Sequence, residues 1–223
     1  MTAARRPLRL AHRGDWRRAP ENTLAALLAA LAVPGCDGLE FDVRCSADGV
    51  PILLHDDTLE RVQRRPERAD ELTAVALDGL GVPSLAAVLS AVPRRAFLDV
   101  ELKGDHGPAT VDTLAAGRGP TLTNAVVSSF ETATLERVAG LAPTWPRWLI
   151  AEDMAPPTIA TALELGCRGI AAHWRAIDAG SARRVRAAGL DLAAWTVRRR
   201  PTFERLAGLG VTAVCVEAAA LDG

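Results

Sequence analysis

The sequence predicts an α/β fold, specifically a (β/α)8 TIM-type barrel, on the basis of three observations. Its 223 residues match the roughly 200–250 residues that one such barrel needs. Short apolar runs alternate with helix-like runs from end to end, a pattern that produces a parallel sheet with right-handed crossovers. About eight strand-like runs occur, which is the number that closes a barrel. A doubly wound open sheet is the alternative, but no glycine-rich phosphate loop follows an early strand.

The expected barrel strands are apolar runs bounded by turn residues. They cover residues 8–11, 38–43, 97–102, 125–128, 147–151, 169–172, 191–197 and 211–216. The expected helices lie between them and cover residues 23–32, 84–91, 110–116, 132–141, 158–165, 179–188 and 201–209. Glycine just past several helix ends, at Gly166, Gly189 and Gly210, supports these bounds.

One segment departs from this alternation. Asp48-Gly49 separates the run 38–43 from the apolar run 50–54, and Asp-Gly between apolar runs indicates a hairpin. Residues 50–54 are therefore expected to return antiparallel and to bring His55 to the end of the preceding strand. The polar stretch 60–80 that follows is expected to be a small exposed insertion in one domain that spans residues 1–223. Whether this insertion forms a lid is left open.

Charge and composition limit the function. A formal net charge of -1 argues against electrostatic binding of nucleic acid. No segment is long and apolar enough for stable membrane insertion, and the first ten residues lack the apolar segment of a signal peptide. We therefore expect a cytoplasmic protein, whose four widely spaced cysteines are free thiols. The oligomeric state is unknown.

Three carboxylates at expected strand ends are the main chemical signal. Glu40 and Asp42 are two apart on one strand and so share a face, and Glu101 ends the next barrel strand. Burying several ionised carboxylates is costly unless a cation compensates them. The three predict an all-oxygen site for one divalent cation, Mg²⁺ or Ca²⁺. Salt bridges to arginine are the alternative for each carboxylate alone.

Two histidines and two cationic residues are expected at the same end of the barrel. His12 and His55 suit proton transfer, since imidazole titrates near neutral pH. Arg13 and Lys103 would bind phosphate oxygens, and Lys103 is the only lysine of the chain. Of the other histidines, His106 is expected at the surface and His173 at the edge of the core.

An ordered set of motifs carries a resemblance to a known family. The motifs are His12-Arg13-Gly14, Pro20-Glu21-Asn22-Thr23, Glu40-x-Asp42, Asp48-Gly49, His55-Asp56, Val82-Pro83-Ser84-Leu85, Glu101-x-Lys103, Ser129-Phe130 and Trp195-Thr196-Val197. In this order and spacing they resemble the glycerophosphodiester phosphodiesterase family. The similarity is strong over residues 8–103 and weaker to about residue 216.

The resemblance implies a phosphoric diester hydrolase with a place in lipid and glycerol metabolism. It would hydrolyse small glycerophosphodiesters to sn-glycerol 3-phosphate and an alcohol. By this similarity the cation ligands are Glu40, Asp42 and Glu101, the acid/base pair is His12 and His55, and the substrate-binding residues are Arg13, Lys103 and Trp195. Glu21 and Asn22 would shape the mouth, although helix capping explains them equally well.

Two positions depart from the family pattern. Arg198 stands where the family usually has asparagine, and Glu217 stands near the usual aspartate-containing turn after the last strand. Arg198 predicts a preference for a more acidic head group. This prediction would be wrong if Arg198→Asn left the ranking of anionic against cationic head groups unchanged.

Two rival functions remain: a phospholipase D-like barrel that cyclises lipids, and a barrel that binds a phosphoester or a partner without turnover.

Overall fold

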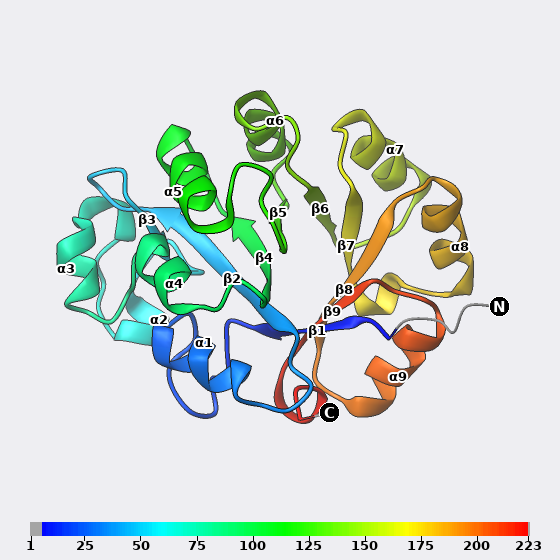
Figure 1. Cartoon of the computed structure of the whole chain (residues 1–223), viewed down its shortest axis with the longest axis horizontal. Coiled ribbons are helices and arrows are strands. Elements are labelled where there is room, and N and C mark those ends of the chain that lie inside the picture. The colour runs from blue at the N-terminus through cyan, green and yellow to red at the C-terminus, as the bar shows by residue number, and fades with distance from the viewer. Residues whose placement is uncertain (1–5, 223) are drawn as a thin grey trace.

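The computed structural model describes residues 6–222, and these form a ring of parallel strands surrounded by helices (Figure 1). The ring strands are β1 (Leu8–His12), β2 (Gly38–Cys45), β4 (Phe97–Leu102), β5 (Ala125–Ser129), β6 (Arg147–Ala151), β7 (Gly169–His173), β8 (Asp191–Val197) and β9 (Ala213–Val216). Strand β1 pairs in parallel with both β2 and β9 and so closes the ring. The predicted closed barrel is confirmed, and the open-sheet alternative is excluded.

The extra strand β3 (Pro51–Leu53) lies outside the ring. It runs antiparallel to the end of β2, with Val43 opposite Leu53 and Cys45 opposite Pro51. The Ser46 hydroxyl accepts a hydrogen bond from the Val50 amide at 3.0 Å and stabilises the turn. The predicted hairpin is confirmed, and it brings His55 back toward the carboxyl ends of the barrel strands.

Seven helices connect the ring strands along the outside of the barrel (Figure 1). They are α1 (Leu24–Leu31), α4 (Leu85–Ala91), α5 (Pro108–Arg118), α6 (Thr132–Leu141), α7 (Pro156–Glu164), α8 (Ala179–Ala187) and α9 (Arg200–Gly208). Side-chain oxygens of Thr23, Ser84 and Asp178 accept amide hydrogen bonds at the starts of α1, α4 and α8. The bounds of the ring strands and of these seven helices lie within two residues of their predicted positions.

The apolar core forms two layers because side chains alternate across each strand. Outward-facing residues such as Ala11, Leu39 and Val100 pack against the helices. Inward-facing residues such as Leu10, Trp148 and Ala193 fill the barrel. On β2 and β4 carboxylates replace this inner apolar layer, so the barrel interior is charged on one side.

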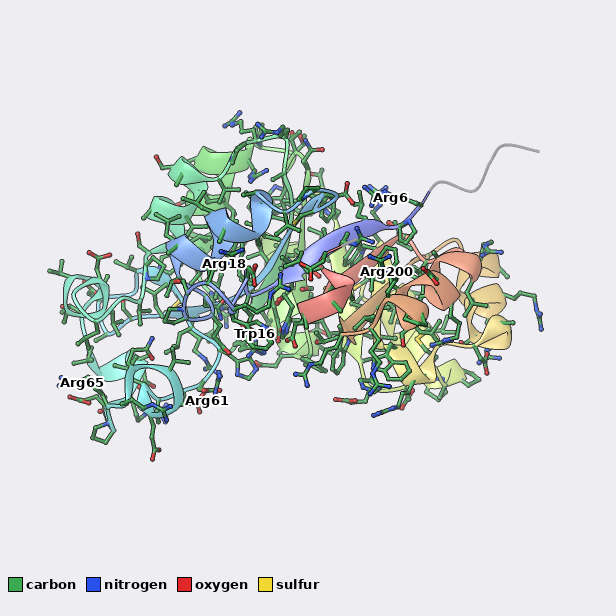
Figure 2. All side chains as sticks on the ribbon, turned by 90° about the horizontal axis from the view of Figure 1, so that it is seen from below. Arg6, Trp16, Arg18, Arg61, Arg65 and Arg200 are labelled. Atoms are coloured by element: carbon green, nitrogen blue, oxygen red, sulfur yellow. The ribbon has the colours of Figure 1, made fainter. Side chains whose placement is uncertain are left out.

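The insertion contains α2 (Glu60–Gln63), a 3₁₀ turn (Ala69–Glu71) and α3 (Ala74–Asp78). Figure 2 shows its Arg61 and Arg65 at the edge of the molecule. The expectation of an exposed segment holds for the charged residues but is wrong for Ala69 and Leu77, which are buried in a small separate core with Ile52. Because charged residues dominate this stretch of sequence, its few apolar residues that pack against Ile52 were not recognised as buried.

Other expectations concern single residues and the membrane. His106 is buried rather than superficial, because its Nε2 lies 3.1 Å from the Val43 carbonyl and its Nδ1 lies 3.0 Å from the Thr110 hydroxyl. His173 is half-buried, as expected for the edge of the core. All four cysteines carry free thiols.

Within residues 6–222 no helix has the length and apolar character needed to cross a membrane. Residues 1–5 of the arginine-rich start lie outside the described part.

Candidate active site

His12 ends β1, and its ring is held from the side of the last strand. Nδ1 of His12 lies 2.5 Å from Oε1 of Glu217, the residue that follows β9. The other ring nitrogen, Nε2, lies 3.8 Å from Oε2 of Glu40. When Nδ1 donates its hydrogen to Glu217, Nε2 is left without a hydrogen and can accept a proton on the side of the ring that faces Glu40.

The chain turns sharply after His12, and this turn requires glycine. Gly14 has φ +87, and a Cβ there would lie 2.5 Å from the Ala26 backbone carbon. No L side chain fits this close approach, so α1 packs directly against the turn. The turn leaves the Arg13 amide donating to the Glu40 carbonyl at 2.8 Å and thereby ties the two strand ends together.

Glu40, Asp42 and Glu101 form a buried carboxylate cluster in which one oxygen from each lies within 4.8 Å of the others. Both carboxylate oxygens of Glu40 are buried without a hydrogen-bond partner among residues 6–222. Buried carboxylate oxygens without donors are strongly unfavourable unless a cation contacts them. This all-oxygen donor set fits a hard divalent cation.

The three carboxylates of this cluster repel one another, and nearby cations offset the repulsion unequally. Burial raises the pKa of Glu40, and the negative charges of Asp42 and Glu101 raise it further. Burial followed by repulsion from Asp42 raises the pKa of Glu101 to about 7. Burial would also raise the pKa of Asp42, but Arg13 and Lys103 outweigh it and lower that pKa to about 2. Asp42 is paired with both Arg13 and Lys103, Glu101 shares Lys103, and Glu40 contacts neither, so the three carboxylates could accept an additional positive charge.

Arg13 and Lys103 flank the same carboxylate. Nε of Arg13 lies 3.0 Å from Oδ2 of Asp42, and Nζ of Lys103 lies 3.2 Å from Oδ1 of Asp42 while also contacting Glu101. The salt-bridge alternative therefore holds for Asp42, though not for Glu40, which contacts neither cation. A metal site and these ion pairs are compatible within one cluster.

His55 approaches from the hairpin. Its Nδ1 lies 2.6 Å from Oδ1 of Asp56, and Arg61 holds the other oxygen of Asp56 at 2.6 Å. Burial lowers the pKa of His55, against an opposing attraction from Asp42. The neutral ring is therefore favoured, with its orientation fixed by a carboxylate as in other acid/base histidines.

One cavity of about 210 Å³ joins these groups. Seven predicted residues line it: His12, Arg13, Glu40, His55, Glu101, Lys103 and Trp195. The eighth, Asp42, lies fully buried beside Glu40 and Glu101. The Trp195 ring forms an aromatic wall of this cavity. Two contacts hold it in place: its indole nitrogen donates to the Ala171 carbonyl at 2.9 Å, and its ring meets the Phe130 ring edge-on with the centroids 5.5 Å apart.

Glu21 and Asn22 support the site rather than cap the helix, whose N-cap is Thr23. Asn22 is buried, and its side-chain amide donates to Oδ2 of Asp42 at 2.8 Å. Glu21 accepts from Arg13 at 2.9 Å and from Arg61. The mouth-shaping interpretation is therefore favoured over the capping one.

The sequence did not predict a place at the site for three further carboxylates. Asp99 lines the cavity, and burial is the main reason that its pKa rises to about 7. Its position two residues before Glu101 on the same strand face could have indicated it. Glu152 lies at the mouth beyond β6. Glu217 was noted only as a departure from a pattern, and nothing in the sequence pairs it with His12.

A buried carboxylate cluster, two cationic side chains and two carboxylate-held histidines thus meet at one end of a closed barrel, an arrangement that suits the hydrolysis of phosphate esters. Residues 12–221 match the Glycerophosphoryl diester phosphodiesterase family, and the chain belongs to that family. It is 27% identical over 247 residues to a glycerophosphodiester phosphodiesterase of Bacillus subtilis, with 94% of this chain and 83% of the relative covered. The named relatives confirm the predicted enzyme class.

The fold matches solved structures of phosphodiesterases. A phosphodiesterase of Oleispira antarctica, solved with the product sn-glycerol-3-phosphate, superimposes with a TM-score of 0.84 at 26% identity, covering 95% of this chain and 93% of that one. A glycerophosphodiester phosphodiesterase of Thermotoga maritima gives a TM-score of 0.83 at 21% identity, covering 98% and 96%. These matches agree with the closed barrel described above.

Proposed function

We propose that this chain hydrolyses glycerophosphodiesters to sn-glycerol 3-phosphate and an alcohol, with residues 1–223 acting as one catalytic domain. The observation that carries this proposal is the meeting of two carboxylate-held histidines with the carboxylate cluster in one cavity. The product named for the Oleispira relative supports the same reaction.

Glu40, Asp42 and Glu101 would hold one divalent cation, Mg²⁺ or Ca²⁺. When bound, such a cation neutralises phosphodiester charge and stabilises the charge that develops on the phosphoryl oxygens. Arg13 and Lys103 line the same cavity and would bind further phosphoryl oxygens. Trp195 would pack against the carbon atoms of the glycerol or of the alcohol.

The two histidines divide the proton transfers. One accepts the proton of an attacking water molecule whose oxygen bonds to phosphorus, and the other donates a proton to the alcohol oxygen as its bond to phosphorus breaks. Water is consumed and no other reactant is needed. Glu217 and Asp56 each contact the Nδ1 side of a ring and would stabilise the imidazolium that forms.

The testing experiment measures glycerol 3-phosphate released from glycerophosphocholine and glycerophosphoethanolamine, with Mg²⁺, with Ca²⁺ and with excess chelator. We expect metal-dependent release in the wild type and a decrease of at least about 10²-fold for His12→Gln and for His55→Gln. Cation-dependent thermal stabilisation, retained in both variants, would show that they fold and keep the metal site.

Other results identify the rival functions. A cyclic phosphate product would indicate attack by the glycerol 2-hydroxyl, as in a lipid-cyclising barrel. Cation binding without turnover of any glycerophosphodiester would support a binding barrel and overturn the proposal. Location in the cytoplasm remains a prediction from the sequence, to be tested by fractionation of cells that express the chain.

A further inference from the structure

A second cavity adjoins the catalytic one. It has a volume of about 480 Å³, and its lining residues lie where β7 and β8 end and α9 begins. Trp195 and Thr196 line both cavities and form the wall that they share. A substrate whose phosphodiester occupies the first cavity could therefore extend a substituent into the second.

The second cavity is strongly cationic. Its lining includes Arg175, Arg198 and Arg199, and no carboxylate belongs to its lining among residues 6–222. Nε of Arg198 lies 2.7 Å from Oε2 of Glu217, so part of that charge is compensated. Arg175 and Arg199 have no ion-pair partner within the described part of the chain, although most arginines elsewhere at the mouth have one, such as Arg61 with Glu21.

The arrangement of these groups suits an anion. The guanidinium carbon of Arg175 lies 4.8 Å from the Trp174 ring centroid, a stacking contact that restrains a side chain otherwise free to move. The hydroxyl-bearing Thr202, which also lines the cavity, lies in the first turn of α9, where the helix dipole favours negative charge. Two guanidinium groups and a positive helix end thus surround one space.

We propose that this cavity binds a second anionic group, such as a phosphate, carried by the alcohol of the substrate. The proposal rests on the proposed function and names its substrate class: glycerophosphodiesters whose alcohol is itself phosphorylated. Each uncompensated guanidinium offers paired N–H donors to phosphate oxygens, and a choline or ethanolamine cation would be repelled at the same position. Arg175 and Arg199 are the specificity-determining residues.

The experiment compares two substrates that differ only by one phosphate: glycerophosphoglycerol and glycerophosphoglycerol esterified with phosphate at its terminal hydroxyl. We expect the wild type to show a kcat/KM about 10-fold or more higher for the phosphorylated substrate, mainly through a lower KM. The double variant Arg175→Gln/Arg199→Gln should lose this preference and change kcat/KM for glycerophosphoglycerol less than about 2-fold.

The matched control removes the same charge elsewhere. Arg94 and Arg95 are exposed just before β4, at the opposite end of the barrel from the cavities, and Arg94→Gln/Arg95→Gln should keep the preference. Equal kcat/KM values for both substrates in the wild type, or equal losses on both in the Arg175/Arg199 variant, would overturn the anion subsite and leave the proposed hydrolysis intact. Absence of turnover of both substrates would overturn the two proposals together.

Discussion

Oε1 of Glu217 lies 2.5 Å from Nδ1 of His12, although 205 positions of the chain separate the two residues. Closure of the barrel between β1 and β9 creates this contact. Glu217 is buried, and Arg198 fixes its second oxygen, so the carboxylate has little freedom to move. Arg198 and Glu217, the two departures from the family pattern, therefore form one unit that positions His12.

The first prediction concerns this unit in catalysis. Glu217→Gln keeps an acceptor near Nδ1 of His12 but removes the negative charge that, in the proposed mechanism, would stabilise the imidazolium. We expect kcat to decrease about 10–100-fold with little change in KM. Steady-state kinetics on glycerophosphocholine checks this, with the exposed Glu164→Gln on α7 as the matched control. An unchanged kcat would mean that Glu217 only packs against the ring.

The second prediction concerns pH and stability. Burial raises the pKa of Glu217, but the hydrogen bond from His12 and the contact with Arg198 outweigh it and lower that pKa to about 2, against 4.5 for the unperturbed group. Ionised Glu217 therefore stabilises the fold above pH 4.5, and this contribution is lost as the pH falls toward 2. Urea unfolding should show that the free energies of unfolding of the wild type and of Glu217→Gln become more similar as the pH falls from 4.5 toward 2. A constant difference would contradict it.

The third prediction separates stability from cation binding. Without a cation, Glu40 is held among other carboxylates, so Glu40→Gln should unfold at a higher temperature than the wild type in chelator. The same variant should lose most of the stabilisation that Mg²⁺ or Ca²⁺ gives the wild type. Thermal unfolding with and without each cation measures both effects. A wild type that gains no stability from either cation would refute the metal site.

The fourth prediction tests why lysine occupies position 103. Its side chain is only 14% exposed and contacts both Asp42 and Glu101. Lys103→Met leaves Glu101 without an ion-pair partner and Asp42 with Arg13 as its remaining one, and should cost about 3 kcal/mol of stability in chelator. Lys103→Arg keeps the charge but introduces a bulkier planar group, and should retain stability better than activity. Equal kcat/KM values for Lys103→Arg and wild type would show that charge alone matters.

The fifth prediction concerns the turn after His12. Gly14→Ala combines a positive φ with a backbone clash and should destabilise the protein by about 3 kcal/mol. Gly49 has φ +74 but open space around a new Cβ, so Gly49→Ala should cost only about 1 kcal/mol. Chemical unfolding compares the two variants. Similar losses would mean that the close approach of α1 is unimportant.

Local patterns predicted most of the fold. Alternating apolar runs, glycines just past helix ends such as Gly166 and the Asp48-Gly49 hairpin signal are read from neighbouring residues, and each was placed correctly. The site residues were predicted because strand ends share one face of the barrel. The pairing of His12 with Glu217 escaped prediction because it depends on closure of the ring. The burial of His106 and Leu77 escaped because both lie within polar sequence.

The two halves of the site have different requirements for assembly. The carboxylate cluster comes entirely from β2 and β4, which are neighbours in the ring, with six residue pairs in register. The His12–Glu217 contact instead requires the first and last strands to meet. Contacts between nearby segments form faster than distant ones during folding. A folding intermediate with an open ring would already gather the three carboxylates, so cation affinity would emerge early and catalytic competence would appear only when the ring closes.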